Sequence, residues 1–99
     1  MNVKIQSIKF NADKKLIDFI SLKVNKLERF FDNIIDADVY LRADKPQEVT
    51  NKIAEIRLNV PGTDLFAHKQ CVTFEEAVDE CIEALKIQIK KHKEKLKKK

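Results

Sequence analysis

The sequence predicts an α+β fold, a two-layer sandwich in which two helices pack on one face of a four-stranded sheet. Apolar residues recur with period two in four segments and with helical period in two others, in the order β-α-β-β-β-α. Each segment has one apolar face, and short turns separate the last three strands, which favours one layer of helices against one sheet. With 99 residues, the chain is expected to form a single domain over 1–99.

The N-terminal third of the chain predicts a strand followed by a helix. Residues 2–9 alternate until the phase slips at Ile8, which indicates either a bulge or the end of the strand. Asn11 or Asp13 can cap the helix that follows, and the helical pattern runs over 14–31. The predicted core face of this helix is an apolar arc made of Leu16, Ile17, Ile20, Val24, Leu27 and Phe31.

Three further strands are predicted over 36–44, 49–60 and 64–72, because apolar and polar residues alternate in each. A Lys-Pro-Gln segment at 45–47 and a Pro-Gly pair supply the turns between them. Lys69 occupies an inward position of the last strand, which favours an edge strand where its long stem can reach water. The expected inward residues are Ala37, Val39, Leu41, Ala43, Ala54, Ile56, Leu58, Val60, Leu65, Ala67 and Cys71.

A long second helix is predicted from Thr73 onward, and Thr73 with Glu76 forms a capping box at its start. From Phe74 to about Lys97 such a helix is roughly 36 Å long at about 1.5 Å per residue. Four strands about 4.8 Å apart form a narrower sheet, so the basic end of the helix is expected to project. The predicted apolar face is Phe74, Val78, Cys81, Ile82, Leu85, Ile89 and Leu96.

Charge is unevenly distributed along the chain. Residues 86–99 hold eight lysines and one glutamate, a net charge of +7. Because the whole chain carries +4, the other 85 residues carry −3. This asymmetry indicates a polyanionic partner, either nucleic acid or an anionic membrane. We expect no membrane partner, because the apolar arc of the helix is already needed for the core. The alternative is a solvated helix end that keeps the protein soluble, although the single acid leaves little internal pairing for the lysines.

A second basic row lies on the first helix, where Lys23, Lys26 and Arg29 alternate with Phe19 and Phe30. Two roughly parallel helices on one sheet face would place the two rows near each other, where both could follow a nucleic-acid backbone. We expect the aromatic rings to fill the seam between the helices, and the histidine of the second helix to pack or to contact RNA. The candidate contacts on the second helix are Lys86, Lys90, Lys91, His92, Lys93, Lys95 and Lys97.

Other function classes are disfavoured. No apolar run is long enough to span a membrane, and the N-terminus lacks the apolar block of a signal peptide, so we expect a cytoplasmic protein. Cys71 and Cys81 lack partners at metal-ligand spacing and are expected to be free and packed. Neither His68 nor His92 belongs to a catalytic array, and no Gly-rich phosphate loop is present. We therefore expect no enzyme, no metal, no cofactor and no small-molecule substrate.

The segment KVNKLERFFD at 23–32 resembles the K-x-x-K-L-E-x-[FY]-F-D signature of the ribosome hibernation-promoting factors. This family is also called ribosome-associated inhibitor A or sigma-54 modulation proteins. FEEAVDECIEAL, followed by QIKKHKEKLKKK at 88–99, resembles the second helix of the family and its lysine-rich end. The resemblance covers nearly the whole chain and implies a β-α-β-β-β-α fold. It also implies binding to 16S-type ribosomal RNA in the decoding region of the small ribosomal subunit, which blocks mRNA and tRNA sites and stabilises idle ribosomes.

Residue by residue, the resemblance implies RNA contacts from Lys23 and Lys26, and Gln88 matches a polar residue ahead of the family's basic end. The chain departs from the family at Ile87, where relatives often have arginine, and Arg29 is not a family fixture. Because the sequence stops after the basic helix, it resembles the short form, in which pairing of ribosomes would need a second hibernation factor. A general double-stranded-RNA-binding module and a protein–protein adaptor stay open as alternatives. The basic end implied by the resemblance comprises Lys91, His92, Lys93, Lys95 and Lys97.

Overall fold

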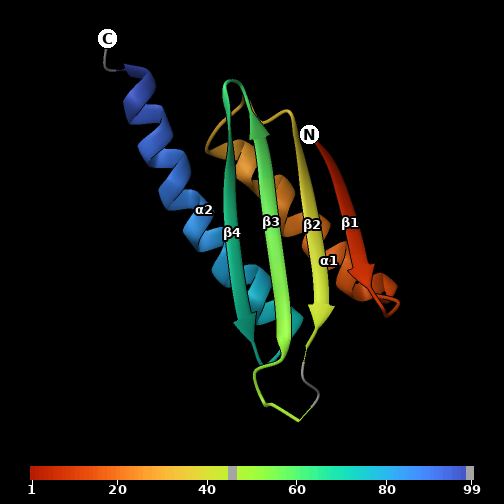
Figure 1. The fold of residues 1–99 in the computed structure, drawn as a ribbon. Helices are drawn as coiled ribbons and strands as arrows, with labels where there is room; N and C mark the ends of the chain where they lie inside the picture. Colours follow the sequence, from red (N-terminus) through yellow and green to blue (C-terminus); the bar gives the residue numbers. More distant parts are fainter. Residues whose placement is uncertain (45–46, 98–99) are drawn as a thin grey trace.

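The computed structural model describes residues 1–44 and 47–97 and confirms the predicted order of elements (Figure 1). Most of the predicted turn at 45–47 and the last two lysines of the predicted basic end, at 98–99, lie outside the described residues. A short 3₁₀ helix, η1, continues the first α-helix. The elements are β1 (Asn2–Ile8), α1 (Lys14–Asn25), η1 (Lys26–Arg29), β2 (Asp36–Ala43), β3 (Lys52–Val60), β4 (Thr63–Cys71) and α2 (Phe74–Lys97).

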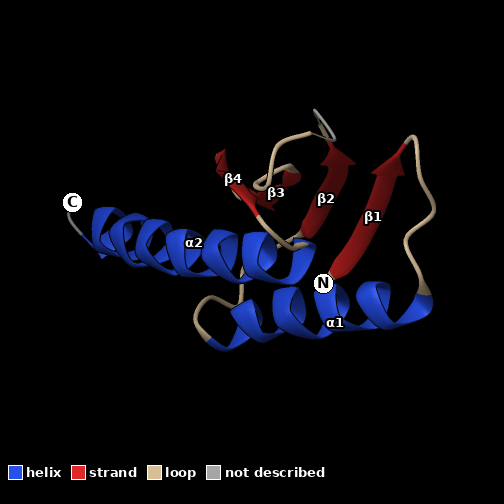
Figure 2. Ribbon diagram, turned by 90° about the horizontal axis from the view of Figure 1, so that it is seen from below, coloured by secondary structure: helices blue, strands red, loops and turns tan. Residues whose placement is uncertain are grey.

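The four strands form one mixed sheet in the order β1-β2-β3-β4. β1 and β2 are parallel because α1 crosses between them, whereas the short connections make β2, β3 and β4 an antiparallel meander. Ile5, Val39, Ile56 and Ala67 stand side by side in register across the strands, which gives the sheet one apolar face. Both helices lie on the same side of the sheet (Figure 2). β4 is an edge strand, as the half-buried Lys69 predicted.

The hydrophobic core lies between this sheet face and the two helices, and most of the predicted core residues are buried in it. Three predictions are wrong. Ile17 is 38% exposed, because it lies at the margin of the apolar arc of α1. Ala43 is exposed at the last position of β2. Leu96 is 54% exposed, because α2 has left the sheet by that point.

The first helix is shorter than the predicted range 14–31, because α1 ends at Asn25 and tightens into η1. Asp13 caps its start, with Oδ1 accepting a hydrogen bond from the backbone N–H of Leu16 at 2.9 Å. After η1 the chain turns, and the carbonyl of Leu27 accepts hydrogen bonds from the N–H groups of the next two aromatic residues, at 3.0 and 3.3 Å. This turn buries Phe31 and leaves the residue before it at the surface.

The long helix α2 is fixed at its start and free at its end. Thr73 Oγ1 accepts a hydrogen bond from the N–H of Glu76 at 3.1 Å, as the capping box predicts. Phe74 stacks on Phe10, with ring centroids 5.0 Å apart, which holds the start of α2 against the loop after β1. Ile89 is the last buried residue among the described ones. The remainder projects beyond the sheet, which confirms the predicted overhang (Figure 1).

Candidate nucleic-acid interface

The helix pair brings together the two basic rows that the sequence predicts. α1 and α2 run side by side under the sheet (Figure 2). Lys23 Nζ on α1 lies 3.3 Å from a carboxylate oxygen of Asp79 on α2. At the other end of the seam, Lys93 Nζ donates a hydrogen bond to the carbonyl oxygen of Phe30 at 2.9 Å. The basic rows therefore face one another from helices that are connected at two points.

The first row and the start of the second surround one small cavity. Lys23, Lys26 and Arg29 line it from α1 and η1, and Lys86 lines it from α2. Its volume is about 140 Å³, and the side chains of Leu27, Phe30 and Ile82 complete its wall. Four of the ten predicted contact residues thus border a single depression at the seam.

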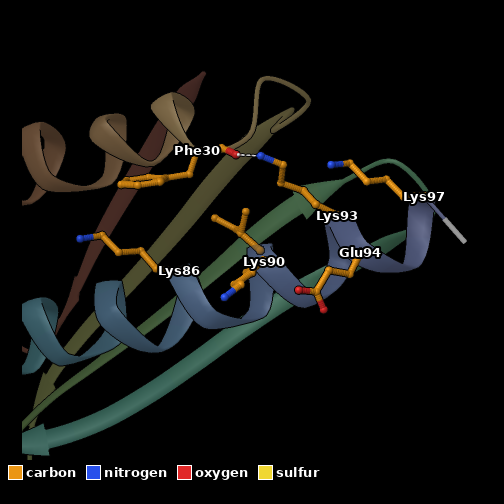
Figure 3. A pocket seen from close by; sticks show the side chains of 7 residues that line it. Phe30, Lys86, Lys90, Lys93, Glu94 and Lys97 are labelled. Atoms are coloured by element: carbon orange, nitrogen blue, oxygen red, sulfur yellow. Dashed lines mark hydrogen bonds between the residues drawn. The ribbon is translucent and has the colours of Figure 1, made fainter.

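A larger groove continues from this cavity along α2, and Lys86 and Phe30 border both (Figure 3). It encloses about 460 Å³. We call it the basic groove, lined by Phe30, Lys86, Ile89, Lys90, Lys93, Glu94 and Lys97. Four cations and one carboxylate around an apolar floor make a surface that favours an anion with a planar or apolar part.

The cations of the two rows are only lightly neutralised. Lys23 pairs with Asp79, and Lys86 pairs with Glu83 at 3.0 Å. Exposed pairs of this kind contribute about 0–1 kcal/mol and are readily exchanged for a phosphate. Within residues 1–44 and 47–97, no carboxylate forms a salt bridge with any of five lysines, namely Lys90, Lys91, Lys93, Lys95 and Lys97.

Not every predicted contact residue borders these depressions. Lys91 and Lys95 are exposed on α2 but line neither the small cavity nor the basic groove. His92 packs edge-on against Phe31, with ring centroids 5.4 Å apart, and its buried Nε2 has no hydrogen-bond partner among the described residues. This placement favours the packing alternative for His92 over RNA contact.

Two residues have different positions from those expected. Phe30 does not fill the seam, since it is 44% exposed and lines the basic groove, whereas Phe19 is half-buried and packs against the core. Gln88 binds the edge strand: its Nε2 donates to the carbonyl of Phe66 at 2.6 Å, and its Oε1 accepts from the N–H of Phe66 at 3.1 Å. Ile87 is exposed beside Lys69 and lies outside the basic groove.

The two cysteines are structural. Both thiols are free and buried. Burial raises the pKa of Cys81 to about 12. Burial, together with a hydrogen bond from Sγ to Glu80 Oε2 at 3.0 Å, raises the pKa of Cys71 to about 11. Both groups are therefore protonated at neutral pH and poor nucleophiles.

The described residues offer neither a metal centre nor a membrane-spanning helix. The described residues contain no group of His, Cys, Asp and Glu side chains arranged to hold a metal ion. Among the helices described, none combines the length and apolar character needed to cross a membrane.

Sequence comparison relates this chain to proteins described as ribosome-associated. A sequence model of the family described as sigma 54 modulation protein / S30EA ribosomal protein matches residues 3–97. A ribosome hibernation promoting factor of Klebsiella oxytoca is 36% identical over 80 residues, which cover 81% of this chain and 80% of that protein. The ribosome hibernation promotion factor of Bacillus subtilis (strain 168) is 31% identical over 101 residues. That match covers 100% of this chain but 52% of the relative, so the chain spans about half of that protein.

A solved structure shares the fold. The structure of a ribosomal subunit interface protein from Coxiella burnetii superposes with a TM-score of 0.84 at 18% sequence identity. The match covers 94% of this chain and 98% of the other. At this identity the likeness shows that both chains have the same arrangement of strands and helices.

Proposed function

The chain belongs to the sigma 54 modulation protein / S30EA ribosomal protein family, and we propose that it binds the small ribosomal subunit and holds ribosomes idle. The family is that of the ribosome hibernation promoting factors, whose role is not enzymatic. In our proposal the whole domain, residues 1–99, occupies the decoding region. It blocks the mRNA and tRNA sites by steric occlusion, without chemistry.

The observation that carries this proposal is the convergence of two basic rows on one seam. Seven cations border the small cavity and the basic groove, and they come from α1, η1 and α2. A chain of RNA phosphates passing along the seam could contact cations from both helices. Each neutralised phosphate releases counterions, so affinity should depend strongly on salt. The proposed contacts are Lys23, Lys26, Arg29, Lys86, Lys90, Lys93 and Lys97.

The overhang of α2 supports the same proposal. Beyond Ile89 the helix has no sheet beside it. This part of the helix is therefore slim enough to fit into a narrow cleft between RNA segments. Lys91 and Lys95 extend from this part of the helix at positions outside the groove, where they could contact a second RNA segment. We propose that the overhang is the part of the domain that enters the subunit.

A charge-reversal variant tests the proposal. Changing Lys90, Lys91 and Lys93 to Glu should abolish co-sedimentation with small subunits in sucrose gradients and leave the core intact, because these side chains are exposed. The matched control reverses Lys4, Lys9 and Lys15, which lie outside both depressions and give the same change in net charge. The control should bind like the wild type, and equal binding by the groove variant would contradict the proposal.

Salt dependence measures how much of the binding is electrostatic. If about 5–8 phosphates are neutralised, the plot of log affinity against log salt should have a slope of about −4 to −7. The slope is obtained from subunit binding at several potassium concentrations. A slope near zero would show that the basic rows are not in contact with RNA phosphates.

Competition separates the proposal from a general double-stranded-RNA-binding module and from a protein adaptor. If the protein recognises the three-dimensional shape of the decoding region, an excess of plain RNA duplex should displace it only poorly from small subunits. A general module would bind the duplex and the subunit with comparable affinity. An adaptor would bind neither the duplex nor ribosomal RNA, since its partner would be another protein.

A further inference from the structure

Phe30 is an aromatic side chain placed at the surface among cations. It is 44% exposed, although the neighbouring Phe31 is buried in the core. A large apolar ring in contact with water gives up part of the stabilisation that burial would provide. Its position between the two basic rows is therefore not explained by packing of the core.

The ring is held in place by the chain around it. The N–H of Phe30 donates to the carbonyl of Leu27 at 3.0 Å, and its own carbonyl accepts from Lys93 Nζ at 2.9 Å (Figure 3). The next residue, Phe31, is anchored in the core against His92. Because the backbone on both sides is held, the side chain leaves the backbone at a fixed point beside the groove, which lowers the ordering cost of binding a ligand.

The surroundings of the ring suit one kind of ligand. Lys86 Nζ lies 5.2 Å from the ring centroid, and Lys90, Lys93 and Lys97 line the same groove. A groove of about 460 Å³ falls within the usual range of about 300–1,000 Å³ for small-ligand sites. A nucleotide combines a planar base, which stacks on an aromatic ring, with a phosphate, which pairs with ammonium groups.

We propose that the basic groove is a subsite for one unpaired nucleotide of RNA, with its base stacked on Phe30 and its phosphate held by Lys86 and Lys90. The proposal rests on the proposed function and deepens it, because it specifies an unpaired RNA nucleotide as the feature that the groove recognises. Bases inside a duplex are stacked on their neighbours and hidden from such a ring. Binding of the base would displace Lys86 Nζ from the ring, and the phosphate would replace Glu83 as its ionic partner.

The experiment uses two RNA hairpins that differ by one bulged, unpaired adenosine. NMR of the full chain with ¹³C-labelled phenylalanine rings should show an upfield shift of the Phe30 ring protons with the bulged hairpin only, because a stacked base shields them. Adenosine monophosphate forms a third arm. A shift with the monophosphate at similar affinity, but none with the bulged hairpin, would overturn the assignment to RNA, and no shift in any arm would overturn the subsite.

Variants give an independent readout. Phe30→Leu should lose the preference for the bulged hairpin by about tenfold or more, and Phe30→Tyr should keep it, because leucine cannot stack and tyrosine can. The salt dependence should stay the same in both, since no cation is removed. The matched control is Phe66→Leu, an exposed aromatic on β4 outside the basic groove, and it should retain the preference. A Phe30→Leu protein that keeps the preference would overturn the proposal.

Co-sedimentation with small subunits is measured in parallel with the same proteins. If the wild type co-sediments and Phe30→Leu shows no loss on either RNA or subunits, the subsite is wrong and the hibernation proposal stands. If the wild type itself fails to co-sediment at modest salt, the hibernation proposal fails, whatever the hairpins show. The two failures are thereby distinguishable.

Discussion

The two halves of α2 continue one helix but meet different surroundings. From Phe74 to Ile89 the apolar side faces the sheet, and six of its residues are buried. From residue 90 to Lys97 the helix has no sheet beside it (Figure 1), and Leu96 is exposed, like the neighbouring lysines. The difference shows that helical periodicity predicts which side of a helix is apolar. Whether that side is buried depends on where the neighbouring element ends.

Truncating one leucine in each half tests the comparison most strongly. Leu85→Ala should lower the free energy of unfolding by about 2–5 kcal/mol, because it leaves a cavity between α2 and the sheet. Leu96→Ala should change it by less than about 0.5 kcal/mol, because the side chain is largely in water. Urea denaturation measures both. Similar losses from the two variants would show that the second half is packed in solution.

Gln88 lies near the junction between the two halves of α2 and binds the helix to the edge strand β4. Gln88→Ala removes both hydrogen bonds to the main chain of Phe66 and should lower the free energy of unfolding by about 1–2 kcal/mol. Lys91→Ala is the matched control, because it shortens an exposed side chain on the same helix without removing a hydrogen bond to the sheet. Equal stability of the two variants in urea denaturation would show that these hydrogen bonds contribute nothing net.

The start of the buried half depends on its cap. Thr73→Ala should destabilise the protein by about 1 kcal/mol, because the N–H of Glu76 loses its acceptor. Thr73→Ser keeps the hydroxyl and should restore most of the loss. Thermal unfolding of the three proteins measures the effect, and an unrestored Thr73→Ser protein would mean that the threonine methyl group, rather than the cap, matters.

The smallest effect expected is the pH dependence of stability that the Cys81 thiol, in the buried half of α2, contributes. The pKa of Cys81 is raised to about 12 in the folded protein, from an ordinary value of 9.0. The unfolded chain therefore loses this proton first, and the stability that the buried thiol contributes below pH 9 is lost as pH rises toward 12. Between pH 7 and 9.5 the loss should be under about 1 kcal/mol.

A variant isolates this contribution from that of Cys71, whose pKa is also raised, to about 11. Cys81→Ala should show a weaker decline in the free energy of unfolding between pH 7 and 9.5 than the wild type. Denaturant unfolding at four or five pH values gives the comparison. Parallel declines in the two proteins would assign the pH dependence to other groups.

The order of elements, the caps and most of the core could be predicted from the sequence, because each depends on a local pattern. Asp13, Thr73 and the alternating strands are of this kind. The errors at Ile17 and Leu96 arose because a residue on an apolar arc is buried only where another element covers it.

The candidate site divides in the same way. The lysine rows could be located from spacing, and their convergence followed from placing both helices on one sheet face. The exposure of Phe30 could not be predicted, because it depends on the chain tightening into η1 and turning after Arg29. The bonds of Gln88 to Phe66 could not be predicted either, because they join positions 22 residues apart that only the tertiary structure brings together.

Those bonds have a consequence for self-association. β4 is one of the two outer strands of the sheet, and an outer strand offers its N–H and C=O groups to any extended chain that approaches. At Phe66 the amide of Gln88 already occupies both groups, as a further strand would. A second molecule could extend the sheet there only by displacing this amide. The side chain near the end of the buried half of α2 thus also closes one position of this sheet edge to a further strand.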